Sequence, residues 1–281
     1  DATLEALALG AKDYMAKPSG MESAEAIERY LQEQLIPKIK VFCAHRLEAK
    51  PPILESELRI TSQDKKCFNN NLKDAFPGRN LETSQKIQKP KSIEILALGV
   101  STGGPNALAT ILPRLPANFP IPIAIVQHMP PMFTKSLAER LTAISQIPVT
   151  EGYNGAQLRP GTAWIAPGDF HLIVERKGTT VRLRTHQGPP ENSCRPSVDV
   201  LFRSVAETYG ASTCAVVLTG MGKDGLRGCE YIREAGGKIL VQDQASSVVW
   251  GMPGFVAKAG LADKVLPLEE MATEIWRSVC C

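Results

Sequence analysis

Residues 93–105 read IEILALGVSTGGP, an apolar run that ends in a glycine-rich segment. Such a run is typical of a buried parallel strand that turns directly into a helix. The turn contains Gly99-Val100-Ser101-Thr102-Gly103, which matches the nucleophile-elbow pattern G-x-S-x-G. A serine here stands at the carboxyl edge of the sheet, where open α/β folds bind ligands, and the following backbone N–H groups can face a developing oxyanion. Taken alone, the pentapeptide indicates a helix N-cap serine as readily as a nucleophile.

The chain after residue 92 continues the alternation of strands and helices. We expect strands at residues 93–100, 121–127, 212–219 and 238–242, and helices at residues 105–112, 134–145, 198–209, 226–235, 253–259 and 268–279. Short strands at residues 162–166, 170–176 and 180–185 predict an antiparallel hairpin insertion. The sequence therefore predicts an α/β fold, a doubly wound and mainly parallel Rossmann-like sheet with helices on both faces, in a catalytic domain at residues 92–281.

The first 91 residues follow a different pattern. Residues 1–42 predict a helix, a short strand at residues 13–16, a Lys-Pro pair and a second helix that Pro37 bends or ends. This order is that of the closing segment of a flavodoxin-like domain without its first strands. Residues 43–91 lose periodicity and contain Pro- and Asn-rich stretches, so we expect a linker there.

Composition argues against several classes of function. Hydrophobic residues make up 43% of the 281 and charged residues 22%, as in soluble globular proteins. The apolar runs are too short to cross a bilayer and the chain starts without a signal segment, so we expect a cytoplasmic protein without direct membrane insertion. The net charge is only +3, and its excess lies in the expected linker, which does not favour a nucleic-acid site. Seven scattered cysteines show no metal-ligand spacing, so we expect reduced thiols and no metal.

The partners of Ser101 follow from topology. His128 ends the strand expected at residues 121–127, and Asp224 follows the strand expected at residues 212–219. Side chains at the carboxyl ends of parallel strands converge, and triads are defined by geometry rather than by chain order. Each partner also has an ordinary structural interpretation: His128 as a hydrogen-bonded strand-end histidine, and Asp224 as the cap of the helix at residue 226, which its position alone favours.

A second arrangement stays open at this level. Ser101, Asp169 and His186 occur in the chain order of α/β-hydrolases, although both partners lie on the expected hairpin insertion. This triad would indicate a small-molecule esterase. A non-catalytic adaptor that keeps the fold for docking is a third reading, against which the intact Ser, His and Asp weigh.

Five motifs occur in order along the chain. They read STGGP (101–105), QHMP (127–130), RPSVD (195–199), GMGKDG (220–225) and WGMP (250–253). Together they resemble the CheB family, the chemotaxis response-regulator methylesterases. The resemblance is dense from about residue 93 to residue 279. It extends to residues 10–20, GAKDYMAKPSG, which look like the end of that family's receiver domain, so the chain resembles a member with an N-terminally truncated receiver.

The resemblance implies a function and a mechanism. Ser101 would be the nucleophile, His128 the general base and Asp224 the acid that orients it. The substrates would be glutamate γ-methyl esters on cytoplasmic helices of methyl-accepting chemoreceptors, with methanol released, and the same apparatus could deamidate glutamines. Neither a cofactor nor a metal is needed. The remaining implied site residues are Met221, whose backbone N–H helps to bind the oxyanion, Thr102, which supports the site, and Arg195, near its mouth, for which a surface salt bridge is nearly as good an explanation.

Two features depart from the family pattern. Cys194 stands where many members carry histidine. The receiver half with the phosphorylated Asp and its acidic metal pocket is absent, and a histidine kinase would act only through that part. We therefore expect residues 1–91 to be loosely ordered or extended, Ser101 to stay accessible, activity to be insensitive to phosphodonors, and deletion of residues 1–91 to change the rate less than about threefold.

Overall fold

The computed structural model of the chain describes residues 2–15, 23–47 and 92–280. The chain divides into two compact units: residues 1–17 together with residues 90–281, and residues 18–89. The first unit holds every candidate site residue. The linker expected at residues 43–91 lies almost wholly outside the described residues.

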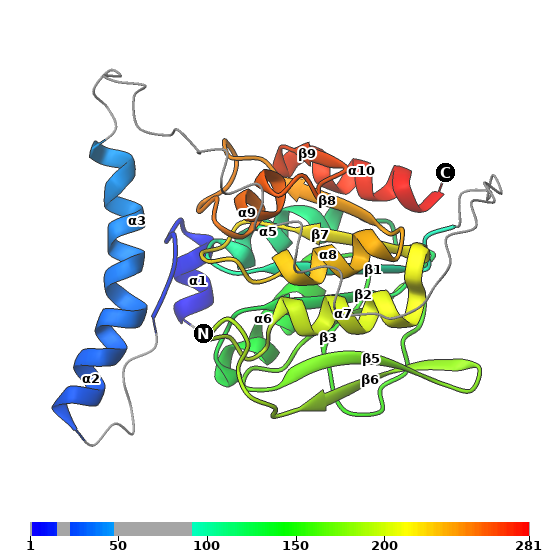
Figure 1. Cartoon of the computed structure of the whole chain (residues 1–281), viewed down its shortest axis with the longest axis horizontal. Coiled ribbons are helices and arrows are strands. Elements are labelled where there is room, and N and C mark those ends of the chain that lie inside the picture. Colours follow the sequence, from blue (N-terminus) through cyan, green and yellow to red (C-terminus); the bar gives the residue numbers. More distant parts are fainter. Residues whose placement is uncertain (1, 16–22, 48–91, 281) are drawn as a thin grey trace, which may run out of the picture. The chain divides into compact units, whose positions relative to one another are not determined.

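A seven-stranded parallel sheet forms the centre of the first unit (Figure 1). Its strands run in the order β3 (Val149–Glu151), β4 (Ala163–Ile165), β2 (Ile123–Gln127), β1 (Ile95–Val100), β7 (Thr213–Val217), β8 (Lys238–Gln242) and β9 (Lys264–Leu266). The central strand β1 is buried along its whole length and pairs in parallel with β2 on one side and β7 on the other. Because the chain goes from β1 outward to β2 and later returns to β7, the strand order reverses at β1, where such sheets bind ligands.

Helices cover both faces of this sheet. One face carries α5 (Gly104–Ile111), α6 (Pro131–Ile144) and α10 (Leu268–Cys280), and the other carries α7 (Val198–Tyr209), α8 (Leu226–Glu234) and α9 (Met252–Lys258). The alternation of side chains along β1 explains the two layers: Leu96 and Leu98 pack in the first core, whereas Ile95 and Ala97 pack in the second. The predicted doubly wound α/β class is confirmed. Short 3₁₀ turns at Leu112–Arg114 and Gly210–Ser212 end α5 and α7.

The hairpin insertion is smaller than expected. It consists of β5 (His171–Lys177) and β6 (Thr180–His186), which pair antiparallel in a separate sheet. Ala163–Ile165, expected in the same insertion, instead joins the main sheet as β4 between β2 and β3. The sheet edges β3 and β9 were not expected at all. Each has three residues and a mixed burial pattern, so neither produces a periodic apolar signal.

The N-terminal segment packs on the α/β unit, which corrects the expectation that it is loosely ordered. In α1 (Ala2–Ala8), Leu7 is 2% exposed and belongs to the same core as α5. Asn106 Nδ2 donates a hydrogen bond of 2.9 Å to the Leu7 carbonyl, and the Tyr14 ring packs edge-on against Phe133 at 5.2 Å. An amphipathic helix can bury its apolar side on an existing domain without the rest of its own domain. The strand expected at residues 13–16 does not form over residues 13–15, because a strand needs a neighbour with which to pair.

The second unit contains one continuous helical segment, formed by α2 (Ala24–Tyr30), a π-helical turn (Leu31–Leu35) and α3 (Ile36–Leu47). Pro37 was expected to bend or end the helix; the helix continues past it to Leu47. Proline lacks the N–H of a regular helical hydrogen bond, and here the π turn lies immediately before it, with the Ile36 N–H bonded to the Leu31 carbonyl five residues back. The helix expected up to residue 42 thus forms and runs on to Leu47, so this part of the chain is not extended.

Glu274 on α10 forms ion pairs with lysines of the strands β8 and β9. Its buried carboxylate accepts hydrogen bonds from Lys238 Nζ at 3.1 Å and Lys264 Nζ at 2.8 Å. Burial raises the pKa of Glu274 but the two lysines lower it further, so the net direction is below the ordinary 4.5. Because both lysines are partly exposed, we expect Glu274→Gln to lower the free energy of unfolding by about 1–2 kcal/mol at pH 7.

The pH dependence of that difference has a definite sign. A carboxyl with a lowered folded-state pKa stabilises the fold fully above its unfolded pKa and loses this contribution as pH falls through the folded value. The wild type and Glu274→Gln should therefore differ in urea unfolding at pH 7 and converge below about pH 4. A difference that persists unchanged at pH 3 would show that the carboxylate charge is not responsible.

Candidate active site

The candidate residues gather at the carboxyl ends of three adjacent strands. Ser101 follows β1 and His128 follows β2, and the register Val100↔Gln127 sets their backbones side by side. The His128 N–H donates to the Val100 carbonyl at 3.1 Å, and the Ser101 N–H donates to Thr219 beyond β7 at 3.0 Å. The topology on which the prediction rested therefore brings the loops of Ser101, His128 and Asp224 to one edge of the sheet.

The turn after Ser101 depends on its glycines. Gly103 adopts φ +78°, in the left-handed region that favours glycine, and the Gly104 N–H closes the turn on the Ser101 carbonyl at 2.8 Å. On the facing loop, a Cβ on Gly220 would lie 2.7 Å from the Ser101 Cβ. The absence of a side chain on Gly220 therefore lets the β7 loop approach the serine, which is itself partly exposed.

Thr102 and Met221 flank Ser101 on these two loops. Within the described parts of the chain, neither of their backbone N–H groups donates a hydrogen bond to the protein. Unpaired donors beside a nucleophile are what an oxyanion hole requires. The Thr102 side chain is buried, and its hydroxyl donates to Asp13 Oδ2 at 3.2 Å, so its packing joins the N-terminal segment to the turn.

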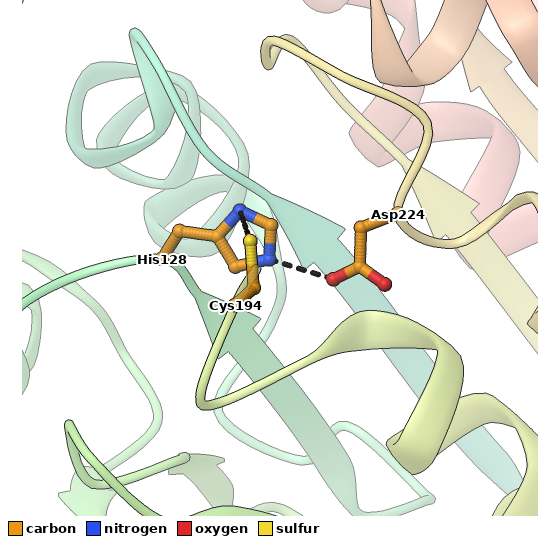
Figure 2. A group of neighbouring side chains, drawn as sticks. All are labelled: His128, Cys194 and Asp224. Atoms are coloured by element: carbon orange, nitrogen blue, oxygen red, sulfur yellow. Dashed lines mark hydrogen bonds and ion pairs between the residues drawn. The ribbon is translucent and has the colours of Figure 1, made fainter. Parts of the chain in front are cut away.

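His128 and Asp224 form a hydrogen-bonded ion pair (Figure 2). His128 Nε2 lies 2.7 Å from Asp224 Oδ2, and the side chains are 13% and 2% exposed. Burial lowers the pKa of His128, but its hydrogen bonds with Asp224 and Cys194 outweigh this, so the net direction is upward. Burial likewise raises the pKa of Asp224. The hydrogen bond with His128, together with those from the Val198 N–H and the Ser197 hydroxyl, outweighs burial and brings the pKa down to about 2. The carboxylate is thus a fixed anion that holds the imidazole Nε2–H.

Asp224 is held by more donors than a surface carboxylate. Oδ2 accepts from the Val198 N–H at 2.7 Å in addition to His128, and Oδ1 accepts from Ser197 Oγ at 2.7 Å, Asn192 Nδ2 at 2.9 Å and the Asp199 N–H at 3.2 Å. Asp224 therefore sits at the N-terminus of α7, where the helix dipole favours an anion.

The helix-cap interpretation of Asp224 is wrong in its detail. The residue that serves the first turn of α8 is Asp199, whose Oδ1 accepts from the N–H groups of Gly225 at 3.0 Å and Gly228 at 2.7 Å. Each buried aspartate thus accepts hydrogen bonds from the N-terminus of another helix. Asp224, in the loop after β7, accepts from the first residues of α7, and Asp199, in α7, accepts from N–H groups at the start of α8. Sequence reasoning missed Asn192, Ser197 and Asp199 as groups that fix Asp224, although the RPSVD motif contains two of them.

The alternative triad does not assemble. Asp169 Oδ1 binds Arg195, with Nε at 2.9 Å and Nη2 at 2.6 Å, and Asp169 Oδ2 accepts from Gln187. His186 Nδ1 accepts from the Gly188 N–H at 3.1 Å. Neither partner bonds Ser101. Arg195 forms the salt bridge with Asp169 that was the competing explanation for it, with the two side chains 25% and 46% exposed.

One part of the expected geometry differs. His128 Nδ1, the nitrogen left over by Asp224, faces Cys194 Sγ at 3.6 Å, and no hydrogen bond joins the described Ser101 hydroxyl to either ring nitrogen. The Cys194 thiol lies against that nitrogen (Figure 2). Catalytic contacts of this kind often tighten only when substrate is bound.

Comparisons with known proteins find a family model, relatives and a solved structure that are similar to this chain. The family model described as CheB methylesterase matches residues 96–275. A protein-glutamate methylesterase/protein-glutamine glutaminase of Trichodesmium erythraeum is 52% identical over 278 residues, which span 99% of this chain and 74% of that protein. A protein of the same description from Nocardioides is 44% identical and covers 98% of this chain and 70% of its own length. The crystal structure of the Thermotoga maritima CheB methylesterase catalytic domain matches with a TM-score of 0.65 and 44% identity, over 66% of this chain and 99% of that domain.

Proposed function

We propose, from the premise that the chain belongs to the CheB methylesterase family, that it is a protein-glutamate methylesterase and protein-glutamine glutaminase of chemotaxis adaptation. The observation that carries this proposal to particular residues is the 2.7 Å bond between His128 and Asp224 beside the Ser101 turn. We assign Ser101 as the nucleophile, His128 as the general base and Asp224 as the residue that orients it.

The reaction follows the chemistry of serine acyl transfer. Ser101 Oγ attacks the carbonyl carbon of a glutamate γ-methyl ester while His128, in its neutral form, takes the hydroxyl proton at Nδ1. The N–H groups of Thr102 and Met221 receive the oxyanion, and each such donor is worth roughly 3 kcal/mol when removed. The imidazolium then gives its proton to the departing methoxide, which leaves as methanol, and a water activated by the same nitrogen hydrolyses the acyl-enzyme. With a glutamine substrate the leaving group is ammonia.

The proposed substrate is a glutamate or glutamine side chain on the cytoplasmic helices of methyl-accepting chemoreceptors, so we also propose that the enzyme works in the cytoplasm. Among the helices of the described residues, none has the length and apolarity to span a bilayer. We propose residues 92–281 as the catalytic domain, residues 43–91 as a linker and residues 1–42 as the end of a receiver domain. A histidine kinase would reach the enzyme only through a receiver.

The activity is tested by methanol release from membranes that carry methylated chemoreceptor. We expect the 1–281 chain to release methanol and, from receptor with glutamines at the same positions, ammonia. Ser101→Ala serves as the matched control and should release neither. Absence of both products from folded wild-type protein would contradict the proposed function.

Reactivity of Ser101 separates the esterase from an adaptor with the same fold. We expect a fluorophosphonate to label the chain once, at Ser101, because the neighbouring imidazole can accept the hydroxyl proton. Intact-mass analysis would measure the adduct, and peptide mapping would place it. His128→Ala should slow labelling strongly and His186→Ala should not. Labelling that is equally fast in His128→Ala would remove His128 from the role of base.

A further inference from the structure

Cys194 and His128 are 66 residues apart in sequence, so cysteine spacing predicted no metal site, yet their side chains meet at the sheet edge. Cys194 Sγ lies 3.6 Å from His128 Nδ1. A tetrahedral zinc ion with ordinary Zn–N and Zn–S bonds holds its nitrogen and sulfur ligands about 3.6 Å apart. One ion could therefore bind both atoms without a change in their separation.

The histidine is also in the tautomer that metal binding needs. In the neutral imidazole, Asp224 accepts the Nε2–H at 2.7 Å, so Nδ1, which faces the thiol, carries the lone pair. A carboxylate behind a metal-bound histidine is a recurring arrangement that orients the ring and increases its basicity. Ligand atoms of His128, Cys194 and Asp224 lie within 4.8 Å of one another. Because both oxygens of Asp224 are already bonded to other donors, we place it behind the histidine rather than on the ion.

The thiol is presented by a well-supported turn. The Glu191 and Cys194 backbones exchange hydrogen bonds of 3.1 and 2.8 Å, and Arg203 binds both carboxylate oxygens of Glu191. Cys194 and His128 are both partly exposed. An ion can thus reach the pair from solvent, and water can complete its coordination.

We propose that Cys194 Sγ and His128 Nδ1 form a binding site for a thiophilic divalent cation, Zn²⁺ in the first instance, and that the bound ion switches off the esterase. A metal-bound cysteine is a thiolate and a metal-bound histidine is neutral, so binding releases to water the protons that Sγ and Nδ1 carry in the free enzyme. The proposed inhibition rests on the proposed function, because the ion occupies the nitrogen that must accept the Ser101 proton. The proposed binding of the ion does not depend on that function.

Binding is measured with Co²⁺ on the 1–281 chain, through the near-ultraviolet thiolate-to-cobalt charge-transfer band. We expect the band in the wild type, its displacement by Zn²⁺, and its loss in Cys194→Ser and Cys194→Ala. The exposed cysteines of the described residues, Cys43 and Cys280, supply the matched controls, and Cys43→Ser and Cys280→Ser should keep the band. Absence of the band in the wild type, or its survival in both Cys194 variants, would overturn the site.

Inhibition is measured separately, as methanol release against free Zn²⁺ with recovery on chelation. We expect the half-inhibiting concentration to rise at least tenfold in Cys194→Ser, each variant being compared with its own metal-free rate. Equal inhibition of wild type and Cys194→Ser would overturn the inhibitory role, as would a wild-type cobalt band without loss of rate. If the wild type shows the band with Co²⁺ but releases no methanol when it is free of metal, the result would instead count against the proposed function.

Discussion

Ser101→Ala is expected to lower the turnover of methyl-ester hydrolysis by roughly 10³-fold or more, and His128→Ala by a similar factor. The pairing of β1 with β2 places the Ser101 turn beside His128. Asp224 bonds Nε2 of that histidine, so Nδ1 is the nitrogen that can accept the serine proton. The measurement is the single-turnover rate of methanol release, which separates chemistry from binding.

The double variant sharpens this test. Because the two residues act in one proton transfer, Ser101→Ala combined with His128→Ala should lose little beyond either single change. The matched control is His186→Ala, which removes the histidine of the alternative triad and should keep a near wild-type rate. If His128→Ala retains activity and His186→Ala abolishes it, the base has been assigned to the wrong loop.

The central strand and its turn could be predicted because their signals are local. The apolar run of β1 and the G-x-S-x-G pattern lie within a few residues of each other, and parallel topology then places Ser101 beside His128. The edge strands β3 and β9 could not be predicted, since three partly exposed residues carry no period. β4 was placed in the wrong sheet for a related reason: a short strand does not encode which neighbour it pairs with.

The finer parts of the site depend on contacts between distant segments. The place of Asp224 just before α8 in the sequence favoured it as the cap of that helix, yet Asp199 has that role. Both aspartates are held by hydrogen bonds between residues 26 to 29 apart in sequence. The contact of Cys194 with His128 is of the same kind. The docking of Leu7 on α5 was missed because seven helical residues cannot bury enough surface alone, whereas a finished domain offers them a complementary face.

Asp224 should be the most sensitive position of the three when activity and stability are measured together. Asp224→Ala removes the partner of the His128 Nε2–H, so turnover should fall by roughly 10³-fold or more. The same change leaves the buried Ser197 hydroxyl and the Val198 and Asp199 N–H groups without an acceptor. We therefore expect the free energy of unfolding to fall by about 3–5 kcal/mol.

Asp224→Asn separates the two effects. Its remaining carbonyl oxygen can still accept from the Ser197 and Asp199 side, so we expect a smaller loss of stability than with alanine. In that orientation the amide NH2 replaces Oδ2 and sets donors against both the His128 Nε2–H and the Val198 N–H. It cannot stabilise the imidazolium either, so turnover should stay as low as in Asp224→Ala. Urea unfolding and single-turnover rates of both variants are compared with Asp169→Ala, whose carboxylate is partly exposed and pairs with Arg195. A near wild-type rate in Asp224→Asn, with the rate lost in Asp169→Ala, would transfer the acid role to Asp169.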